Sequence, residues 1–173
     1  MGVLTIYAMS GPYGVPMEKS KHSAHSIADA FQQLHPRLWR GLLAFTASAD
    51  LASEAEAEAF AQALARGDDI RDLTSWVWTS AYRIARGLLA ERSKQGPQAA
   101  SPSTFTEDVH LVEFVSMLGE LSEQQRMVVI LRYIGGYKPA EIAEVLATSP
   151  ETVRVQLHRA HSSLRETVGS HYD

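Results

Sequence analysis

Residues 141–160 read EIAEVLATSPETVRVQLHRA, and this stretch decides the fold of the second half of the chain. It predicts two short helices joined by a tight turn. Ser149 is a good N-cap, and Pro150 suits the first helical position because its missing N–H costs nothing there. Glu151 is favoured by the positive end of the helix dipole. A second helix is therefore expected to begin at Pro150.

One face of this second helix is predicted to be buried, and the rest to point outward. Apolar side chains recur at helical spacing in Val153, Leu157, Ala160 and Leu164. The side chains left to point elsewhere are Thr152, Arg154, Val155, Gln156 and Arg159. This is the layout of a helix-turn-helix whose second helix enters the major groove of DNA. An ordinary helical hairpin is the alternative that the motif alone leaves open.

The composition is that of a globular chain with room for one or two small domains in 173 residues. The absence of cysteine excludes disulfides and thiolate metal sites and suits a cytoplasmic protein. No apolar run reaches the roughly 18 residues that span a bilayer, so no membrane insertion is expected. The apolar segment 3–9 is too short for a signal-peptide core, and residues 1–24 are predicted to be a tail.

Two helical blocks, 25–94 and 109–168, are predicted on either side of a linker at 95–108. The linker contains two prolines, a glycine and small polar residues, with little to bury. Its fourteen residues can extend over about 45 Å, so the blocks need not touch. Residues 169–173 are predicted to be a second tail.

No segment shows strand alternation, so the chain is predicted to be all-α, with two small helical domains joined by a flexible linker. Before the helix-turn-helix, helices are expected from near His25 past a break or kink at Pro36, at 51–65, at 72–94, near 109–118 and at 122–134. The segments 67–69 and 135–136 are expected to interrupt the helical pattern.

Charge is distributed unevenly along the first block, although the net charge of the chain is only −4. Residues 49–72 hold seven acidic side chains against two arginines, whereas residues 73–95 hold four basic side chains against one glutamate. An acidic segment followed by a basic helix indicates two surfaces with different partners. Two solvated helix faces are the alternative reading.

Motifs in both blocks follow the pattern of one protein family. The second block contains LSEQQR at 121–126, LRY at 131–133, GY at 136–137, AEIA at 140–143, TVR at 152–154 and LHRA at 157–160. The first block contains an acidic helix around Glu54 to Phe60, then Trp76, YRIAR at 82–86, and Arg92. Over about residues 26–168 the chain resembles an extracytoplasmic-function (ECF) sigma factor of bacterial RNA polymerase, with regions 2 and 4 in order.

Five positions depart from the pattern of that family. Ala57 replaces a usual glutamine in the acidic helix, and Glu56 stands at an apolar position nearby. Gly87 and Glu91 replace the usual Asn and Asp of the region 2 recognition helix. Ala147 stands where the turn of the helix-turn-helix usually has glycine.

The resemblance implies that the second block binds the distal (−35) promoter element. The predicted contact residues are Lys138, Glu151, Thr152, Arg154, Val155, Gln156, His158 and Arg159. Arginine pairs with guanine, glutamine pairs with adenine, and Val155 suits a thymine methyl group. Lys138, His158 and Arg159 are expected to contact phosphates instead. Because six basic residues balance six acidic ones from residue 121 onward, DNA binding without polymerase should be weak.

The resemblance also implies that the basic helix of the first block opens the upstream (−10) element and holds one strand. Single-stranded DNA is held by aromatic planes and by cations. The predicted residues are Trp76, Trp78, Tyr82, Arg83, Arg86, Arg92 and Lys94. Trp76 lies on the apolar stripe of the helix, so Trp78 is expected to be the exposed stacking residue. The loop at 67–73 would border a pocket for a flipped base.

The acidic helix is implied to dock on an arginine-rich part of the core polymerase. The predicted contact residues are Glu54, Glu58 and Phe60. Opposite charges favour such a contact by setting orientation and encounter rate. An anti-sigma factor is the further partner that the resemblance implies.

No nucleophile–base pair and no phosphate-binding glycine loop occurs in the sequence, so no enzymatic activity, catalytic residue or cofactor is predicted. His158 and His161 have helical spacing, but no further ligand accompanies them, so no metal site is predicted. Two other functions stay open: a dimeric helix-turn-helix regulator, and a sigma-like adaptor that no longer reads promoters.

Overall fold

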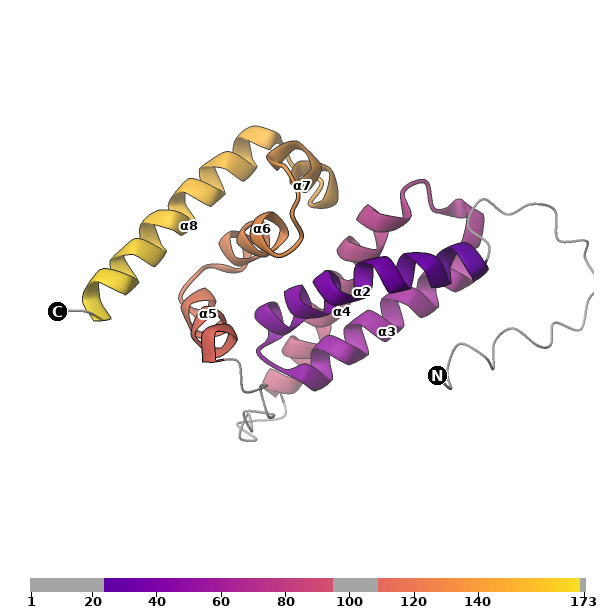
Figure 1. Cartoon of the computed structure of the whole chain (residues 1–173), viewed down its shortest axis with the longest axis horizontal. Helices are drawn as coiled ribbons and strands as arrows, with labels where there is room; N and C mark the ends of the chain where they lie inside the picture. Colours follow the sequence, from indigo (N-terminus) through magenta and orange to yellow (C-terminus); the bar gives the residue numbers. More distant parts are fainter. Residues whose placement is uncertain (1–23, 95–108, 172–173) are drawn as a thin grey trace, which may run out of the picture.

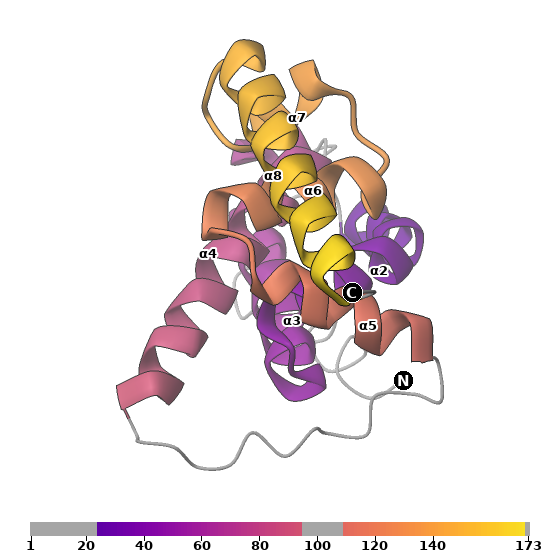
Figure 2. The same cartoon turned by 90° about the vertical axis from the view of Figure 1, so that its left-hand side faces the viewer.

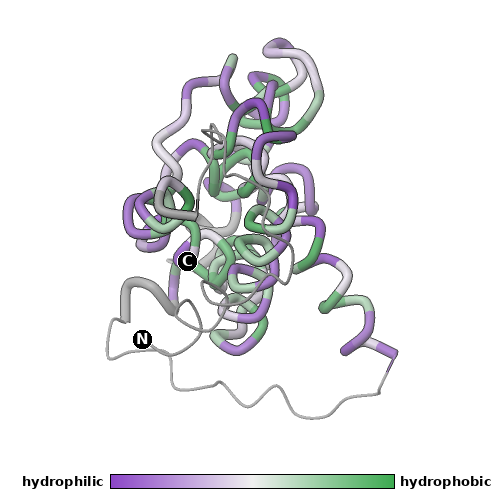
Figure 3. The backbone as a smooth tube through the Cα atoms, turned by 90° about the vertical axis from the view of Figure 1, so that its right-hand side faces the viewer, coloured by the Kyte–Doolittle hydropathy of each residue, from purple (hydrophilic) through white to green (hydrophobic). Residues whose placement is uncertain are grey.

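The computed structural model describes residues 24–94 and 109–171, and every regular element in these two ranges is helical (Figure 1). The prediction of an all-α chain is confirmed. Residues 1–23 of the predicted tail 1–24, and the whole of the predicted linker 95–108, lie outside the described residues. Apolar and polar segments alternate along the helices (Figure 3), as amphipathic helices around a core require. Within the described residues, no helix has the length and apolar character needed to cross a bilayer.

The first block consists of three long helices packed on one another. They are α2 (Ala24–Thr46), α3 (Ala49–Arg66) and α4 (Leu73–Lys94), with a 3₁₀ turn at Gly67–Asp69. Ser48 caps α3 by accepting a hydrogen bond from the Leu51 N–H, and Gly67 ends it at a positive φ of 55°. Each of the three helices contacts the other two.

The sequence predicts a break or a kink at Pro36, and a break does not occur, because α2 continues through this residue. A proline removes one backbone hydrogen bond and leaves the carbonyl four residues earlier without its partner. Pro36 and Gln32 are both exposed, so water can satisfy that carbonyl and the helix need not end.

The second block contains three shorter helices followed by one long helix. They are α5 (Val109–Gly119), α6 (Glu123–Tyr133), α7 (Pro139–Val145) and α8 (Pro150–His171). A capping box between Ser122 and Gln125 starts α6, and the predicted break at 135–136 follows it. α8 runs past the predicted block boundary at 168.

The two blocks pack against each other. α2 contacts α5 and α6, and α4 contacts α7, so α5 and α6 lie between α8 and the first block (Figures 1 and 2). One continuous set of buried apolar side chains extends through both blocks. This arrangement brings α4 and the helix-turn-helix, which the sequence assigns to different promoter elements, next to each other.

Candidate nucleic-acid interface

The helix-turn-helix has the local geometry that the sequence predicts. The Thr152 N–H donates to the Ser149 hydroxyl at 3.0 Å, so Ser149 caps α8. Val153 and Ala160 are fully buried, and Leu157 is 9% exposed. The turn before α8 places Ala147 at φ +50°, a left-handed conformation that favours glycine. The departure noted at this position therefore carries backbone strain.

The outer face of α8 presents an open row of side chains. Those exposed are Glu151, Thr152, Arg154, Val155, His158 and Arg159. Val155 is one of two large apolar side chains described as exposed, at 43%. Lys138 is also exposed, at the start of α7. The predicted distal-element residues thus reach solvent, with Lys138 at the start of α7 and the others on α8, except for Gln156, which is partly buried.

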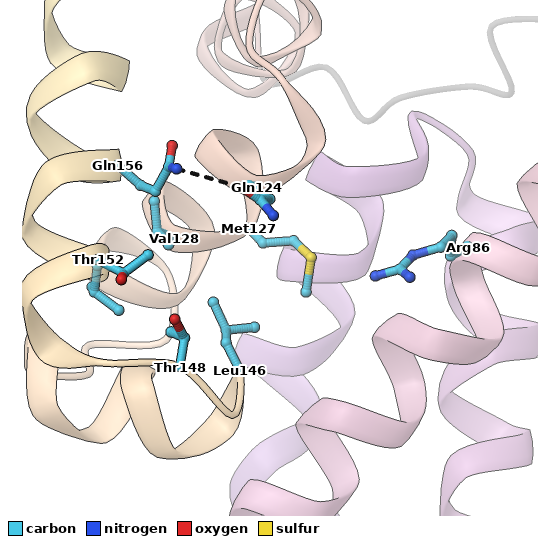
Figure 4. Close-up of a pocket in the computed structure, with 9 residues that line it drawn as sticks. Arg86, Gln124, Met127, Val128, Leu146, Thr148, Thr152 and Gln156 are labelled. Atoms are coloured by element: carbon cyan, nitrogen blue, oxygen red, sulfur yellow. Dashed lines mark hydrogen bonds between the residues drawn. The ribbon is translucent and has the colours of Figure 1, made fainter.

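Gln156 lies on the flank of α8 that faces α6. Its side-chain amide donates to the Gln124 side-chain oxygen at 3.3 Å (Figure 4). It is partly buried, whereas its neighbour Val155 is exposed. In this conformation the Gln156 amide is occupied and does not project from the open face of the helix.

Two of the three aromatic residues predicted to stack on DNA bases are buried in the core of the protein. Trp78 and Tyr82 are each 1% exposed, and their rings stack with centroids 5.7 Å apart. Tyr82 meets Phe45 edge-on at 5.3 Å, and Trp78 meets Tyr137 of the second block at 5.9 Å. Burial raises the pKa of the Tyr82 hydroxyl well above its usual range.

The expectation that Trp78 is exposed is therefore wrong, and Tyr82 is not available for stacking in this conformation. The physical reason is tertiary: α4 is covered by α2, by α3 and by α7 of the second block, so it buries more than one stripe. Trp76 is only partly buried, with the Arg66 guanidinium 5.8 Å from its ring centroid. Trp76 is thus the most accessible of the three.

The four cations of α4 are exposed, and each has a polar neighbour. Arg83 donates to Gln62 at 3.5 Å, Arg92 donates to Ser48 at 3.1 Å, and Lys94 lies 3.8 Å from Glu91. Arg86 forms an ion pair of 2.6 Å with Glu123 of the second block. Surface pairs of this kind are worth little and exchange readily for phosphate.

The acidic helix α3 carries both exposed and buried acidic side chains. Glu54 and Glu58 are exposed, and Glu58 accepts a hydrogen bond from Gln62 at 2.8 Å. Phe60 is 5% exposed and packs edge-on against Phe31 with ring centroids 4.9 Å apart. Its role as a surface contact is therefore not supported by the structure, because its ring belongs to the core.

Glu56 is a buried acid that the sequence marked only as a departure from an apolar position. It is 4% exposed, and its Oε2 lies 2.8 Å from the His35 Nδ1. Its other carboxylate oxygen has no hydrogen-bond partner among the described residues. Burial raises the pKa of the Glu56 carboxyl above its usual range, and the hydrogen bond and charge of His35 oppose that rise.

The loop before α4 has a structural role in the described conformation. Asp72 accepts hydrogen bonds from the Ser75 N–H at 3.2 Å and from the Ser75 hydroxyl at 2.7 Å, which caps α4. The predicted pocket for a flipped base at 67–73 remains a prediction. Within the described residues, no cluster of three metal-ligating side chains occurs, and His161 lies 2.7 Å from the Tyr133 hydroxyl.

A cavity of about 170 Å³ lies among α6, α7 and α8 of the second block, and Arg86 of α4 also contributes to its lining (Figure 4). Its lining is formed by Arg86, Gln124, Met127, Val128, Leu146, Thr148, Thr152, Val153 and Gln156. It brings Arg86, predicted for the melted element, to the same space as Thr152 and Gln156, predicted for the distal element. No sequence pattern indicated the contacts of Gln124 and Glu123, because their partners Gln156 and Arg86 lie far away along the chain.

Comparisons with known proteins agree with this geometry. Residues 111–164 match the model of the family "Sigma-70, region 4". The chain is 26% identical over 145 residues to the ECF RNA polymerase sigma factor SigL of Mycobacterium tuberculosis, covering 76% of this chain and 82% of SigL.

Two solved structures share the fold at 20% identity. One is CnrH in complex with the cytosolic domain of CnrY, with a TM-score of 0.68 over 84% of this chain and 89% of CnrH. The other is the sigma factor RpoE of Bartonella quintana in complex with the anti-sigma factor NepR, with a TM-score of 0.63 over 82% of this chain and 97% of RpoE.

Proposed function

Because this chain belongs to the ECF sigma factors of the sigma-70 family, we propose that it binds core RNA polymerase and directs it to promoters through two DNA elements. Residues 25–94 would act as region 2 and residues 109–168 as region 4, with 95–108 as the tether. The role is non-enzymatic and cytoplasmic, since the polymerase and the chromosome are there.

The observation that carries this proposal is the open face of α8. Arg154 and Val155 reach solvent from the first two turns of a capped helix, and no partner occupies their side chains in the described part of the chain. Arginine at such a position can pair with guanine O6 and N7, and Val155 can contact a thymine methyl group. Lys138, His158 and Arg159 are also exposed, and we propose that they contact phosphates, which would fix the position of the helix.

Gln156 takes a smaller part in this proposal than its residue type suggests. Its amide is bonded to Gln124, so pairing with adenine requires this bond to break. Arg154 is therefore the principal base reader that we propose.

The basic face of α4 is proposed to hold the melted strand. Arg83, Arg86, Arg92 and Lys94 are exposed on this helix, and their weak neutral or ionic contacts can be replaced by phosphates. Trp76 is the proposed stacking residue, since it alone among the three aromatic candidates is partly accessible.

The exposed acids Glu54 and Glu58 are proposed to dock on a basic surface of the core polymerase. They lie one turn apart on α3, and complementary charge would orient the encounter. The neutral balance of charge after residue 121 makes this docking necessary, because few net cations are available to hold DNA.

An anti-sigma factor is proposed as a further partner. NepR is an anti-sigma factor, and it is bound to a sigma factor that shares the fold of this chain. The likeness of the fold extends over most of both chains, which supports a partner of this kind.

Selection of bound DNA from a randomised duplex library tests the function. The chain alone, core polymerase alone and their mixture are each incubated with the library, and the retained DNA is sequenced. We expect two separated sequence elements to be enriched only by the mixture. Enrichment of a palindrome by the chain alone would identify a dimeric regulator instead. Binding to core polymerase without any enriched sequence would identify an adaptor.

A further inference from the structure

The C-terminal end of α6 holds an exposed tyrosine against α8. Tyr133 is 58% exposed, and its hydroxyl lies 2.7 Å from the His161 Nε2. The two rings are tilted, with their centroids 5.8 Å apart. Because His161 is exposed as well, the burial of a core does not account for this contact. It fixes an exposed tyrosine hydroxyl on the surface of the second block.

His161 belongs to a row of side chains along one flank of α8. Arg154, His158, His161 and Arg165 recur at a spacing of three or four residues, and all four are exposed. The row contains no acidic side chain between Arg154 and Arg165. Tyr133 therefore lies beside the basic flank of α8, two helical turns after the residue proposed to read a base.

The dimensions of DNA bring a phosphate to this part of α8. A recognition helix contacts base edges with its N-terminal residues, and the major groove of B-DNA is about 12 Å wide. Because a helix rises 1.5 Å per residue, His161 lies about 10 Å beyond Arg154 along the helix axis. Side chains at that distance from a base contact approach the strand that borders the groove. Tyrosine is among the side chains that contact phosphate oxygens there.

The loop after α6 holds a proposed phosphate contact at the same end of this helix. The Tyr137 N–H donates to the Leu131 carbonyl at 3.1 Å, and Arg132 donates to the Tyr137 carbonyl at 3.0 Å. The loop thus folds back on the last turn of α6. Lys138, the next residue, is therefore kept at the end of α6 that carries Tyr133.

From these contacts we propose that the Tyr133 hydroxyl donates a hydrogen bond to a backbone phosphate of the distal promoter element, and that His161 is its positioning residue. The inference rests on the proposed function and deepens it. It adds a phosphate contact from α6, outside the helix-turn-helix formed by α7 and α8.

The direction of the hydrogen bonds follows from the groups involved. A hydroxyl has one proton, so Tyr133 cannot donate to His161 and to a phosphate at the same time. When the Nε2 of His161 carries a proton, this nitrogen donates to the Tyr133 oxygen. The Tyr133 proton is then free for the phosphate, and the imidazole fixes the direction in which the hydroxyl points.

A scan with neutral phosphates tests the contact. The probe is a promoter duplex from the library selection in which one phosphate at a time is replaced by a methylphosphonate. Fluorescence anisotropy measures its binding to core polymerase that carries the full chain. We expect Tyr133→Phe to bind the unmodified duplex about tenfold more weakly than the parent, because a hydrogen bond to a charged group is lost. One distal-element methylphosphonate should weaken the parent similarly and leave Tyr133→Phe unchanged.

Tyr137→Phe is the matched control for the loss of a hydroxyl. It removes the same atom from a tyrosine of the same block whose ring packs edge-on against Trp78 of the first block. The phosphates at which substitution weakens binding should be the same in this variant as in the parent. If Tyr133→Phe binds as tightly as the parent, or stays sensitive at every phosphate at which the parent is sensitive, the contact is overturned.

A double-mutant cycle distinguishes positioning by His161 from a separate contact. His161→Ala should weaken binding by the parent chain but cost little more in Tyr133→Phe, because its effect passes through the Tyr133 hydroxyl. Equal losses in the two backgrounds, or no loss in the parent, would overturn the positioning role.

The same measurements separate this inference from the proposed function. A parent complex that binds no selected duplex would refute the proposed function and this inference with it. Promoter binding with the same sensitive phosphates in the parent and in Tyr133→Phe would refute this inference alone.

Discussion

The two helices assigned to DNA differ in how much of their predicted contact surface is free. α8 presents Arg154, Val155 and Arg159 to solvent and buries only its apolar stripe. α4 buries Trp78 and Tyr82 and holds Arg86 in an ion pair with the other block. The proposed DNA-contact face of α8 is therefore open to solvent, whereas much of that of α4 is in contact with the rest of the protein.

This difference follows from how each helix is packed. α8 contacts its own block along one stripe, so its exposed face can be read from helical periodicity. α4 is packed by α2, by α3 and by α7, and the last contact joins residues far apart in sequence. The chemistry of an aromatic side chain does not say whether its ring meets a base or a protein core.

Replacing Trp78 with alanine should produce the largest change in stability. A small change would mean that Trp78 is a surface residue, and the contrast between α4 and α8 would then fail. Because its ring is fully buried, we expect Trp78→Ala to lower the free energy of unfolding by about 3–5 kcal/mol. Trp76→Ala, on the same helix but partly exposed, should cost clearly less. Urea unfolding followed by circular dichroism measures both, and a larger loss in Trp76→Ala would contradict the packing described.

Replacing Arg154 with alanine tests the proposed base contact on the exposed face of α8. We expect Arg154→Ala to weaken promoter binding by the complex with core polymerase by about 1–3 kcal/mol and to relax selection at one base pair. Arg165→Ala on the same helix is the control and should leave base preference unchanged. Fluorescence anisotropy with promoter duplexes measures the affinity. An equal loss for every substituted base pair would assign Arg154 to phosphate.

Replacing Ala147 with glycine sharpens the account of the helix-turn-helix. Since Ala147 has a φ of +50°, we expect Ala147→Gly to raise the free energy of unfolding by about 1 kcal/mol. Ala61→Gly, in the interior of α3, should lower it by a similar amount. Thermal unfolding of the two variants should therefore shift in opposite directions. A loss of stability in Ala147→Gly would show that this turn carries no strain.

Replacing Glu56 with glutamine tests the first block through the pH dependence of its stability. The change in the free energy of unfolding should be the smallest of the four predicted effects, because His35 opposes the rise in the Glu56 pKa that burial causes. Burial raises the pKa of Glu56, so the folded chain holds this proton more tightly than the unfolded chain. The protonated Glu56 therefore contributes to the stability of the folded chain below the usual glutamate pKa. This contribution is lost as the pH rises through the raised pKa of the folded chain. Glu56→Gln should therefore be more stable than the parent chain at pH 8.

The advantage of Glu56→Gln should shrink as the pH falls toward the usual glutamate range. Glu54→Gln, an exposed acid on the same helix, should show no such trend. A parent chain more stable than Glu56→Gln at pH 8 would mean that the His35 contact outweighs the burial.

Much of the fold could be predicted from the sequence because the signals are local. Ser149 and Pro150 mark the start of α8, Ser122 and Gln125 form the capping box of α6, and the glycine pair at 135–136 ends that helix. The motifs that identify the family lie on these same elements. The sequence left a break or a kink open at Pro36, and α2 is not broken there, because an exposed site tolerates the lost hydrogen bond.

The errors in the predicted site arise from contacts that no local pattern encodes. Phe60 and Tyr82 are buried by aromatic neighbours on other helices. The hydrogen bond between Gln156 and Gln124 likewise joins two helices and has no local signal in the sequence, while the DNA contact of Gln156 stays a prediction. Residue type can nominate a contact residue, but packing decides whether it is available.

Transcription in vitro tests the central claim most directly. Core RNA polymerase is supplied with a randomised promoter library, with and without the full chain, and the 5′ ends of the transcripts are sequenced. We predict defined start sites that depend on the chain and share two upstream elements. Start sites identical to those of core polymerase alone would contradict the account.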